Sequence, residues 1–158
     1  MAVNLHASHY RFGVDELAES THGWHAAEDV DPVQGAIASD VVFLLRFCVQ
    51  ETGGTAAANT DLQFQYNRNG AGWVNITTTS SVVKAVAAAA LTNAGNCTKR
   101  LSGTGTFETS GAGQTEDGLS GGAPNDIAAS GNSETECGLQ IIGADVNART
   151  PVHETPLM

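Results

Sequence analysis

The chain has 158 residues, which fits a single domain that can bury a core of its own. Its 17 acidic and 7 basic residues give a formal net charge of -10, and the bases are scattered, so the composition argues against a nucleic-acid partner, which needs clustered lysine and arginine. Only 15% of the residues are charged and 18 are glycine, a composition typical of an all-β domain with long loops.

The N-terminal segment, residues 1–9, has no hydrophobic period and predicts an extended arm. It lacks the basic and apolar regions of a signal peptide, and the longest apolar run, VVFLL, is too short to span a bilayer. We therefore expect a protein that is made in the cytoplasm, carries no export signal and has no membrane partner.

Two strand signals come next in the chain. YRFGV, residues 10–14, alternates and predicts a short strand, whereas residues 15–31 suit a helical turn, a strand or an ordered loop around Trp24. DVVFLLRFCVQET, residues 40–52, is apolar on both faces in its first half, so it predicts a central strand of the sheet.

The stretch LQFQYNRNGAGWVNI, residues 62–76, predicts a complete hairpin, because apolar residues alternate with glutamine and asparagine on both sides of a turn. Asn69, Gly70 and Gly72 tolerate the positive φ angles that a reversal needs. The polar face carries amides and no charges, so it can lie at an interface without the desolvation cost of buried ions. We predict a scaffold on the apolar face and a contact surface on the amide face, with Trp73 in the core or at the tip.

The C-terminal half contains fewer strand signals. Residues 80–95 predict a strand that ends in a helical turn or loop, and residues 101–133 are rich in Gly, Ser and Thr with one short strand near Thr106 and Phe107. ETECGLQIIGADV, residues 134–146, predicts the last core strand, and residues 147–158 predict a C-terminal arm. Together the elements predict an antiparallel, jelly-roll-like β-sandwich over residues 10–146, with long loops and terminal arms.

Histidine and cysteine offer the first candidates for a metal site. His6 pairs with His9 and His22 with His25 at an HxxH spacing, but residues i and i+3 of a strand point to opposite faces, so we expect solvated or packed histidines. If they cluster at a subunit boundary, they would make that boundary sensitive to pH. Three cysteines without a CxxC spacing predict no zinc knuckle and no disulfide framework; we expect buried, reduced thiols at Cys48 and Cys137.

The remaining patterns give no catalytic constellation. The sequence has no phosphate-binding loop and no DxDxDG calcium loop. Glu134 and Glu136 share a strand face, and we expect them at a solvated strand end. Trp24 and Trp73 are the candidates for stacking on a sugar ring. We expect no enzyme, with no catalytic residues, cofactor or metal.

Seven stretches distributed over residues 10–146 carry a resemblance to a known family. They are YRFGVDELAESTHGWHAAEDVD, VVFLLRFCVQETGG, LQFQYNRNGAGWVNI, SSVVKAV, LSGTGTF, EDG and ETECGLQIIGADV. In this order they resemble a loosely defined family of phage- and prophage-associated β-rich virion proteins, whose motifs are structural. The chain departs from the family pattern at its end, where NARTPVHETPLM replaces a further strand.

The resemblance implies a bacteriophage virion structural protein, most simply a capsid decoration (cement) protein. Its expected partners are the major capsid protein and copies of itself, in a homo-oligomer such as a trimer. The alternative is a tail or fibre module that binds host-surface carbohydrate, which would present Trp24 or Trp73 to solvent beside acidic residues.

Overall fold

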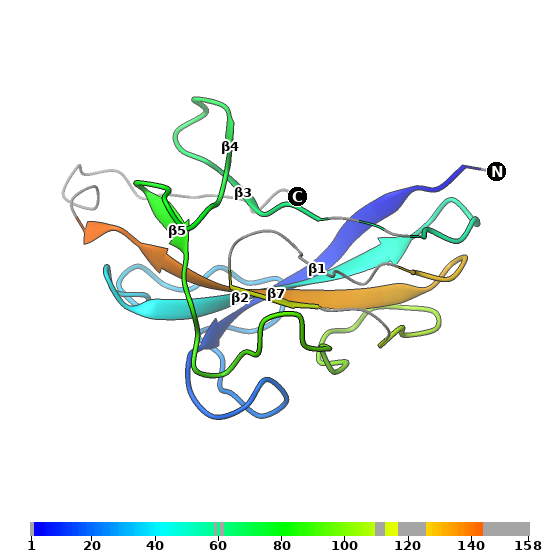
Figure 1. The fold of residues 1–158 in the computed structure, drawn as a ribbon, viewed down its shortest axis with the longest axis horizontal. Helices are drawn as coiled ribbons and strands as arrows, with labels where there is room; N and C mark the ends of the chain where they lie inside the picture. The colour runs from blue at the N-terminus through cyan, green and yellow to red at the C-terminus, as the bar shows by residue number, and fades with distance from the viewer. Residues whose placement is uncertain (1, 59, 61, 110–112, 117–125, 144–158) are drawn as a thin grey trace.

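The computed structural model describes residues 2–58, 60, 62–109, 113–116 and 126–143 (Figure 1). The regular secondary structure of the described residues is almost all β-strand, paired antiparallel except at β6, which confirms the all-β class. The strands are β1 (Leu5–Val14), β2 (Val42–Glu51), β3 (Gln65–Asn67), β4 (Trp73–Asn75), β5 (Val83–Ala85), β6 (Gln114–Thr115) and β7 (Asn132–Ile141).

Three ten-residue strands form the centre of the main sheet, in which the order is β1-β2-β7-β5. Strand β2 pairs antiparallel with β1 on one side and with β7 on the other, so its prediction as a central strand is confirmed. The short strands β5 and β6 both pair with β7, antiparallel and parallel respectively. The predicted last core strand is also confirmed, as β7.

One face of the main sheet carries the larger apolar core. Side chains alternate between the two faces of a strand, so β2 directs Phe43, Leu45 and Phe47 to this face and Leu44 to the other. Cys137 and Leu139 of β7 join the same cluster. As expected, Cys48 and Cys137 are buried free thiols, and Cys97 is a third.

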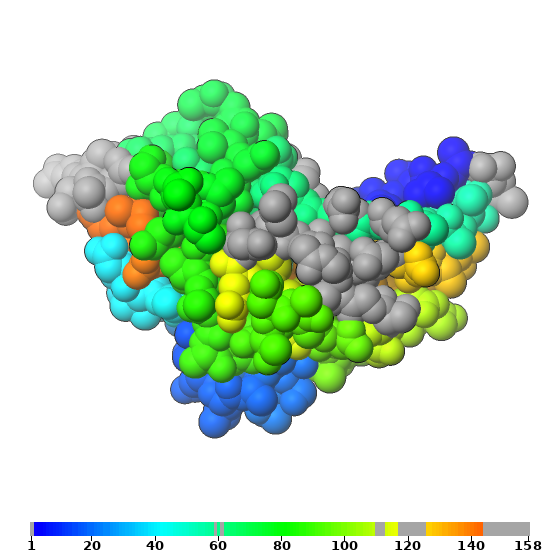
Figure 2. Space-filling view, in the orientation of Figure 1, coloured from blue at the N-terminus to red at the C-terminus, as the bar shows by residue number. Residues whose placement is uncertain are grey.

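The β3–β4 hairpin covers this core and projects away from the main sheet (Figures 1 and 2). Phe64 and Ile76, at the base of the hairpin, are buried in the cluster, and the Phe64 and Phe47 rings lie 5.7 Å apart. The backbone amide of Ile76 donates to the Phe64 carbonyl at 2.8 Å, which closes the base. The apolar face of the predicted hairpin is therefore scaffold.

Loops cover the opposite face of the sheet. Residues 15–31 form no helix, and their backbone runs along the outer edge of β1, where His25 and Asp29 donate amide hydrogen bonds to Phe12 and Tyr10. These hydrogen bonds give partners to backbone carbonyl groups of β1 that would otherwise be free at the edge of the sheet. Residues 86–107 cross the same face, as a loop after β5.

The N-terminal arm is shorter than predicted, because β1 begins at Leu5 and residues 5–9 belong to the sheet. Strand β1 also contains a β-bulge: Ala7 pairs with Val49 and His9 with Cys48. The prediction that His6 and His9 point to opposite faces is wrong, because the extra residue restores them to one face. The predicted C-terminal arm, residues 147–158, lies outside the described residues.

Glu51, the last residue of β2, ties three chain segments together through a buried carboxylate. Its two oxygens accept hydrogen bonds of 2.6–3.2 Å from the backbone amides of Asn4, Gly53, Gly54 and Ser130. These amides, that of Ser130 most strongly, lower the pKa of Glu51 from 4.5 to about 2.

Glu51→Gln is expected to lower the urea midpoint of unfolding at pH 7, because glutamine lacks the charge and one acceptor oxygen. A carboxylate with a lowered folded-state pKa stabilises the fold above its unfolded-state pKa and loses that contribution as pH falls through the folded-state value. The gap between the two midpoints should therefore close between pH 4.5 and about 2. A gap that stays constant over this range would contradict the assignment.

Candidate functional site

The tip of the β3–β4 hairpin reverses where the sequence predicts. Asn69, Gly70 and Gly72 have φ angles of 53°, 74° and 111°, which confirms the predicted positive φ at each. The Asn67 side-chain oxygen accepts the Gly72 amide at 3.2 Å and so fixes the turn. A non-glycine residue at Gly72 would be strained at this angle.

Four residues form one outward face of the hairpin, which we call the hairpin face: Gln65, Asn67, Trp73 and Asn75. They are two cross-strand pairs, Gln65 opposite Asn75 and Asn67 opposite Trp73. The Gln65 amide donates to the Asn75 side chain at 2.8 Å. None of the four is ionisable, so the face can be desolvated without burying a charge.

The two tryptophans have different surroundings. Trp73 is 41% exposed, so it lies at the tip and outside the core, and its neighbour Val74 is 47% exposed. Trp24 lies against cations: the guanidinium carbons of Arg100 and Arg11 are 4.3 and 4.6 Å from its ring centroid. Trp73 is therefore the tryptophan available for contact with a partner or a sugar.

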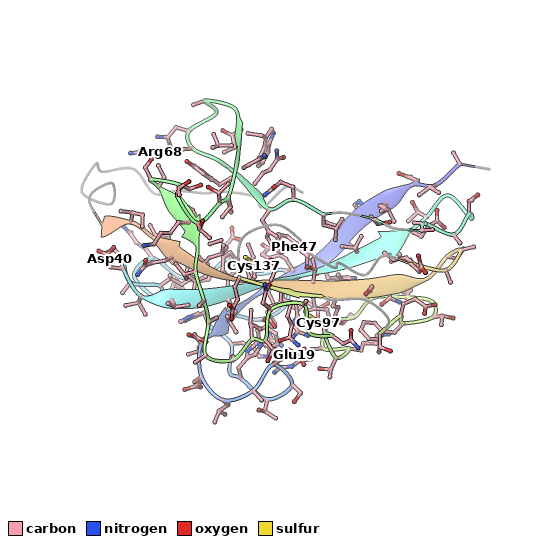
Figure 3. All side chains as sticks on the ribbon, viewed as in Figure 1. Glu19, Asp40, Phe47, Arg68, Cys97 and Cys137 are labelled. Atoms are coloured by element: carbon pink, nitrogen blue, oxygen red, sulfur yellow. The ribbon has the colours of Figure 1, made fainter. Side chains whose placement is uncertain are left out.

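A network of buried ions lies under the sheet, on the side opposite the hairpin (Figure 3). Arg46 of β2 is fully buried and donates to Glu134 at 2.8 Å and to Glu136 at 2.6 Å, both from β7. It also donates to the Glu19 carboxylate. The prediction that Glu134 and Glu136 lie at a solvated strand end is wrong, since both are 0% exposed.

The network also fastens the loops that cover this face. Glu134 accepts the backbone amides of Arg100 and Leu101, both at 2.8 Å, through the oxygen that Arg46 does not use. The Glu19 carboxylate accepts the Thr98 amide at 2.9 Å. Residues 98–101 and 19 are thereby bound to the two central strands through charge-assisted hydrogen bonds.

His22, from the second HxxH pair, is buried and packed at this network. Its Nδ1 donates to the Gly23 carbonyl at 2.9 Å, which leaves Nε2 2.9 Å from Glu136 Oε1. The contact is poorly directed, since neither atom meets hydrogen-bond geometry. The ring fits because Gly13 has no side chain; a Cβ there would lie 2.8 Å from the imidazole.

The charges in the network reinforce one another. Burial raises the pKa of Glu136, but the adjacent His22 and Arg46 side chains outweigh it, so this pKa lies below its usual value. Burial likewise lowers the pKa of Arg46, but Glu136 and Glu19 outweigh it and raise this pKa. Arg46 and Glu136 therefore form an ion pair in the folded protein.

Two clusters among the described residues bring metal-ligating groups within 4.8 Å of one another. In the buried one, Glu19, Cys97 and Glu136, the cation position is taken by Arg46, which donates to both carboxylates. Burial also raises the pKa of the Cys97 thiol well above its usual value, so the thiolate that a metal needs is disfavoured. The second cluster is His9, Glu28 and Asp29 at the edge of β1.

Comparison with known proteins finds no matching family model, no matching curated protein and no matching solved structure. Among the described residues, no helix has the length and hydropathy needed to cross a membrane.

Proposed function

We propose that this protein is a bacteriophage capsid decoration protein, which stabilises the head through many contacts with the major capsid protein and with copies of itself. The observation that carries the proposal is the hairpin face. It combines an exposed aromatic ring, Trp73, with amide side chains from Gln65, Asn67 and Asn75. Interfaces are enriched in tryptophan and depleted in charge at their centres.

The body of the protein supports such a contact because it holds the hairpin rigidly. Phe64 and Ile76 anchor the hairpin on one side of β2, and Arg46 ties the other side of β2 to β7 and the loops. A rigid surface loses little conformational entropy on binding, so more of the contact energy appears as affinity.

Many copies would compensate for a small contact in each copy. Strands β3 and β4 have three residues each, so the hairpin face is small beside the surface that a stable protein interface buries. Multivalent attachment raises avidity without any new contact, which suits a homo-oligomer such as a trimer on a capsid lattice.

The resemblance of residues 10–146 to phage-associated virion proteins supports the same class, and a jelly-roll-like sandwich is part of this proposal. Phe64 and Ile76, which flank β3 and β4, pack on the apolar face of the main sheet, and a contact of this kind supports a sandwich.

Quantitative mass spectrometry of purified particles tests this function. We expect on the order of hundreds of copies per particle, because a cement protein occupies every equivalent lattice position. A handful of copies per particle would contradict the decoration role.

A tail or fibre module that binds carbohydrate is the second candidate, and exposed Trp73 favours it. Aromatic rings stack on sugar rings, and the neighbouring amides can bind hydroxyl groups. Glycan-array binding that Trp73→Ala abolishes, together with a low copy number, would favour this function over decoration.

A further inference from the structure

The β-bulge in β1 aims His9 at the loop that runs along the edge of the sheet. Ser8 is the extra residue between the Ala7–Val49 and His9–Cys48 pairs. Bulges redirect the side chains that follow them and are frequent beside functional sites. Here the redirected imidazole faces two carboxylates.

The three side chains converge on a small volume at the protein surface. His9 Nδ1 lies 2.7 Å from Asp29 Oδ2 and 3.2 Å from Glu28 Oε1. All three ligand atoms lie within 4.8 Å of one another. The side chains are partly open to solvent, with exposed fractions of 28% for His9, 21% for Glu28 and 44% for Asp29, so an ion and its waters have access.

Both carboxylates are already oriented by donors outside the cluster. Asp29 Oδ1 accepts the Tyr10 amide at 2.9 Å, which leaves Oδ2 toward His9. Glu28 accepts the backbone amide and the hydroxyl of Ser102, at 2.9 and 3.2 Å. Such outer contacts fix the ligand atoms and raise the affinity of metal sites.

The spacing also fits a transition metal. Metal–ligand bonds of about 2.0–2.2 Å place neighbouring ligands of a tetrahedral ion about 3.3 Å apart. The His9–Glu28 distance already agrees with this value, and the His9–Asp29 distance requires a small opening at the exposed Asp29. In this structure His9 Nδ1 donates to Asp29 Oδ2 at 2.7 Å.

We propose that His9, Glu28 and Asp29 form a binding site for a divalent transition-metal ion of the Zn²⁺ class, with one coordination position left for water. The imidazole favours Zn²⁺ over Ca²⁺ and Mg²⁺, which prefer an all-oxygen set. The site is independent of the hairpin face and of the proposed decoration role.

Isothermal titration of the purified full chain with Zn²⁺ tests the site, with His6→Ala as the matched control. His6 is an exposed histidine of the same strand, and the register places it on the same face as His9. We expect one Zn²⁺ per chain in the wild type and in His6→Ala, with an affinity at least about tenfold lower in His9→Ala and Glu28→Gln. Bound Co²⁺ should give the intense visible absorption of a four-coordinate site. Circular dichroism verifies that each variant is folded.

Three results would overturn the proposal. They are wild-type affinity for Zn²⁺ in folded His9→Ala, an equal loss in His6→Ala and His9→Ala, and tighter binding of Ca²⁺ than of Zn²⁺ to the wild type.

Discussion

Arg46→Met is expected to destabilise the protein by about 3–5 kcal/mol, the cost of leaving buried charges without their partner. Arg46 is fully buried and donates to three carboxylates, those of Glu19, Glu134 and Glu136. Methionine fills most of the volume of the arginine side chain, so the loss of stability measures the effect of the charge and its hydrogen bonds. A loss of this size is a large part of the stability of a typical domain, and urea unfolding followed by tryptophan fluorescence measures it.

The double variant Arg46→Met with Glu136→Met provides the control. Arg46 and Glu136 lie opposite each other in the sheet, so the two substitutions together remove one charge of each sign. We expect it to recover part of the stability lost in the single variant, because fewer charges remain uncompensated. Stability of Arg46→Met within about 1 kcal/mol of the wild type would show that the network is not needed.

Trp73→Ala is expected to weaken attachment to particles by about 30-fold, the effect of about 2 kcal/mol for a tryptophan at the centre of an interface. Trp73 is 41% exposed and outside the apolar core, so the variant should unfold at nearly the wild-type urea concentration. Binding to particles that lack the protein, measured by sedimentation, gives the ratio of affinities.

Two further variants sharpen this experiment. Asn75→Asp preserves an acceptor for the Gln65 amide but adds a charge to the hairpin face, so it should also weaken attachment. Leu17→Ser is the matched control, since Leu17 is a 71% exposed apolar residue of the segment 15–31. This segment lies on the side of the sheet away from the hairpin (Figure 1). Equal losses of affinity for particles in Leu17→Ser and Trp73→Ala would contradict a specific role for the hairpin face.

The segments with a clear pattern of apolar residues or of turn residues could be predicted from the sequence. The two-sided apolar run of β2 specified a central strand, and Asn69, Gly70 and Gly72 specified the turn of the hairpin. These features are local: a period of two and a tolerance for positive φ are properties of neighbouring residues.

The buried ion network could not be predicted by the same means, because it depends on which strands become neighbours. Glu134 and Glu136 alternate with small residues, a pattern that also suits a strand with one solvated face. The available signal was Arg46, a cation inside an otherwise apolar strand, which requires an acidic partner when that strand is buried. The pairing of β2 with β7 supplies it, since Arg46 lies opposite Glu136.

The surroundings of His9 were missed for a similar reason. The spacing from His6 to His9 predicts opposite faces only if the strand is regular, and the bulge at Ser8 breaks that assumption. The contact with Glu28 and Asp29 then depends on a loop that aligns with the edge of β1.

A cryo-EM reconstruction of intact particles tests the central claim most directly, because it places every copy of the protein. The account predicts density for this protein on the head lattice, with Gln65, Asn67, Trp73 and Asn75 buried against a neighbouring subunit. A hairpin face open to solvent in all copies, or a protein found only on the tail, would contradict it.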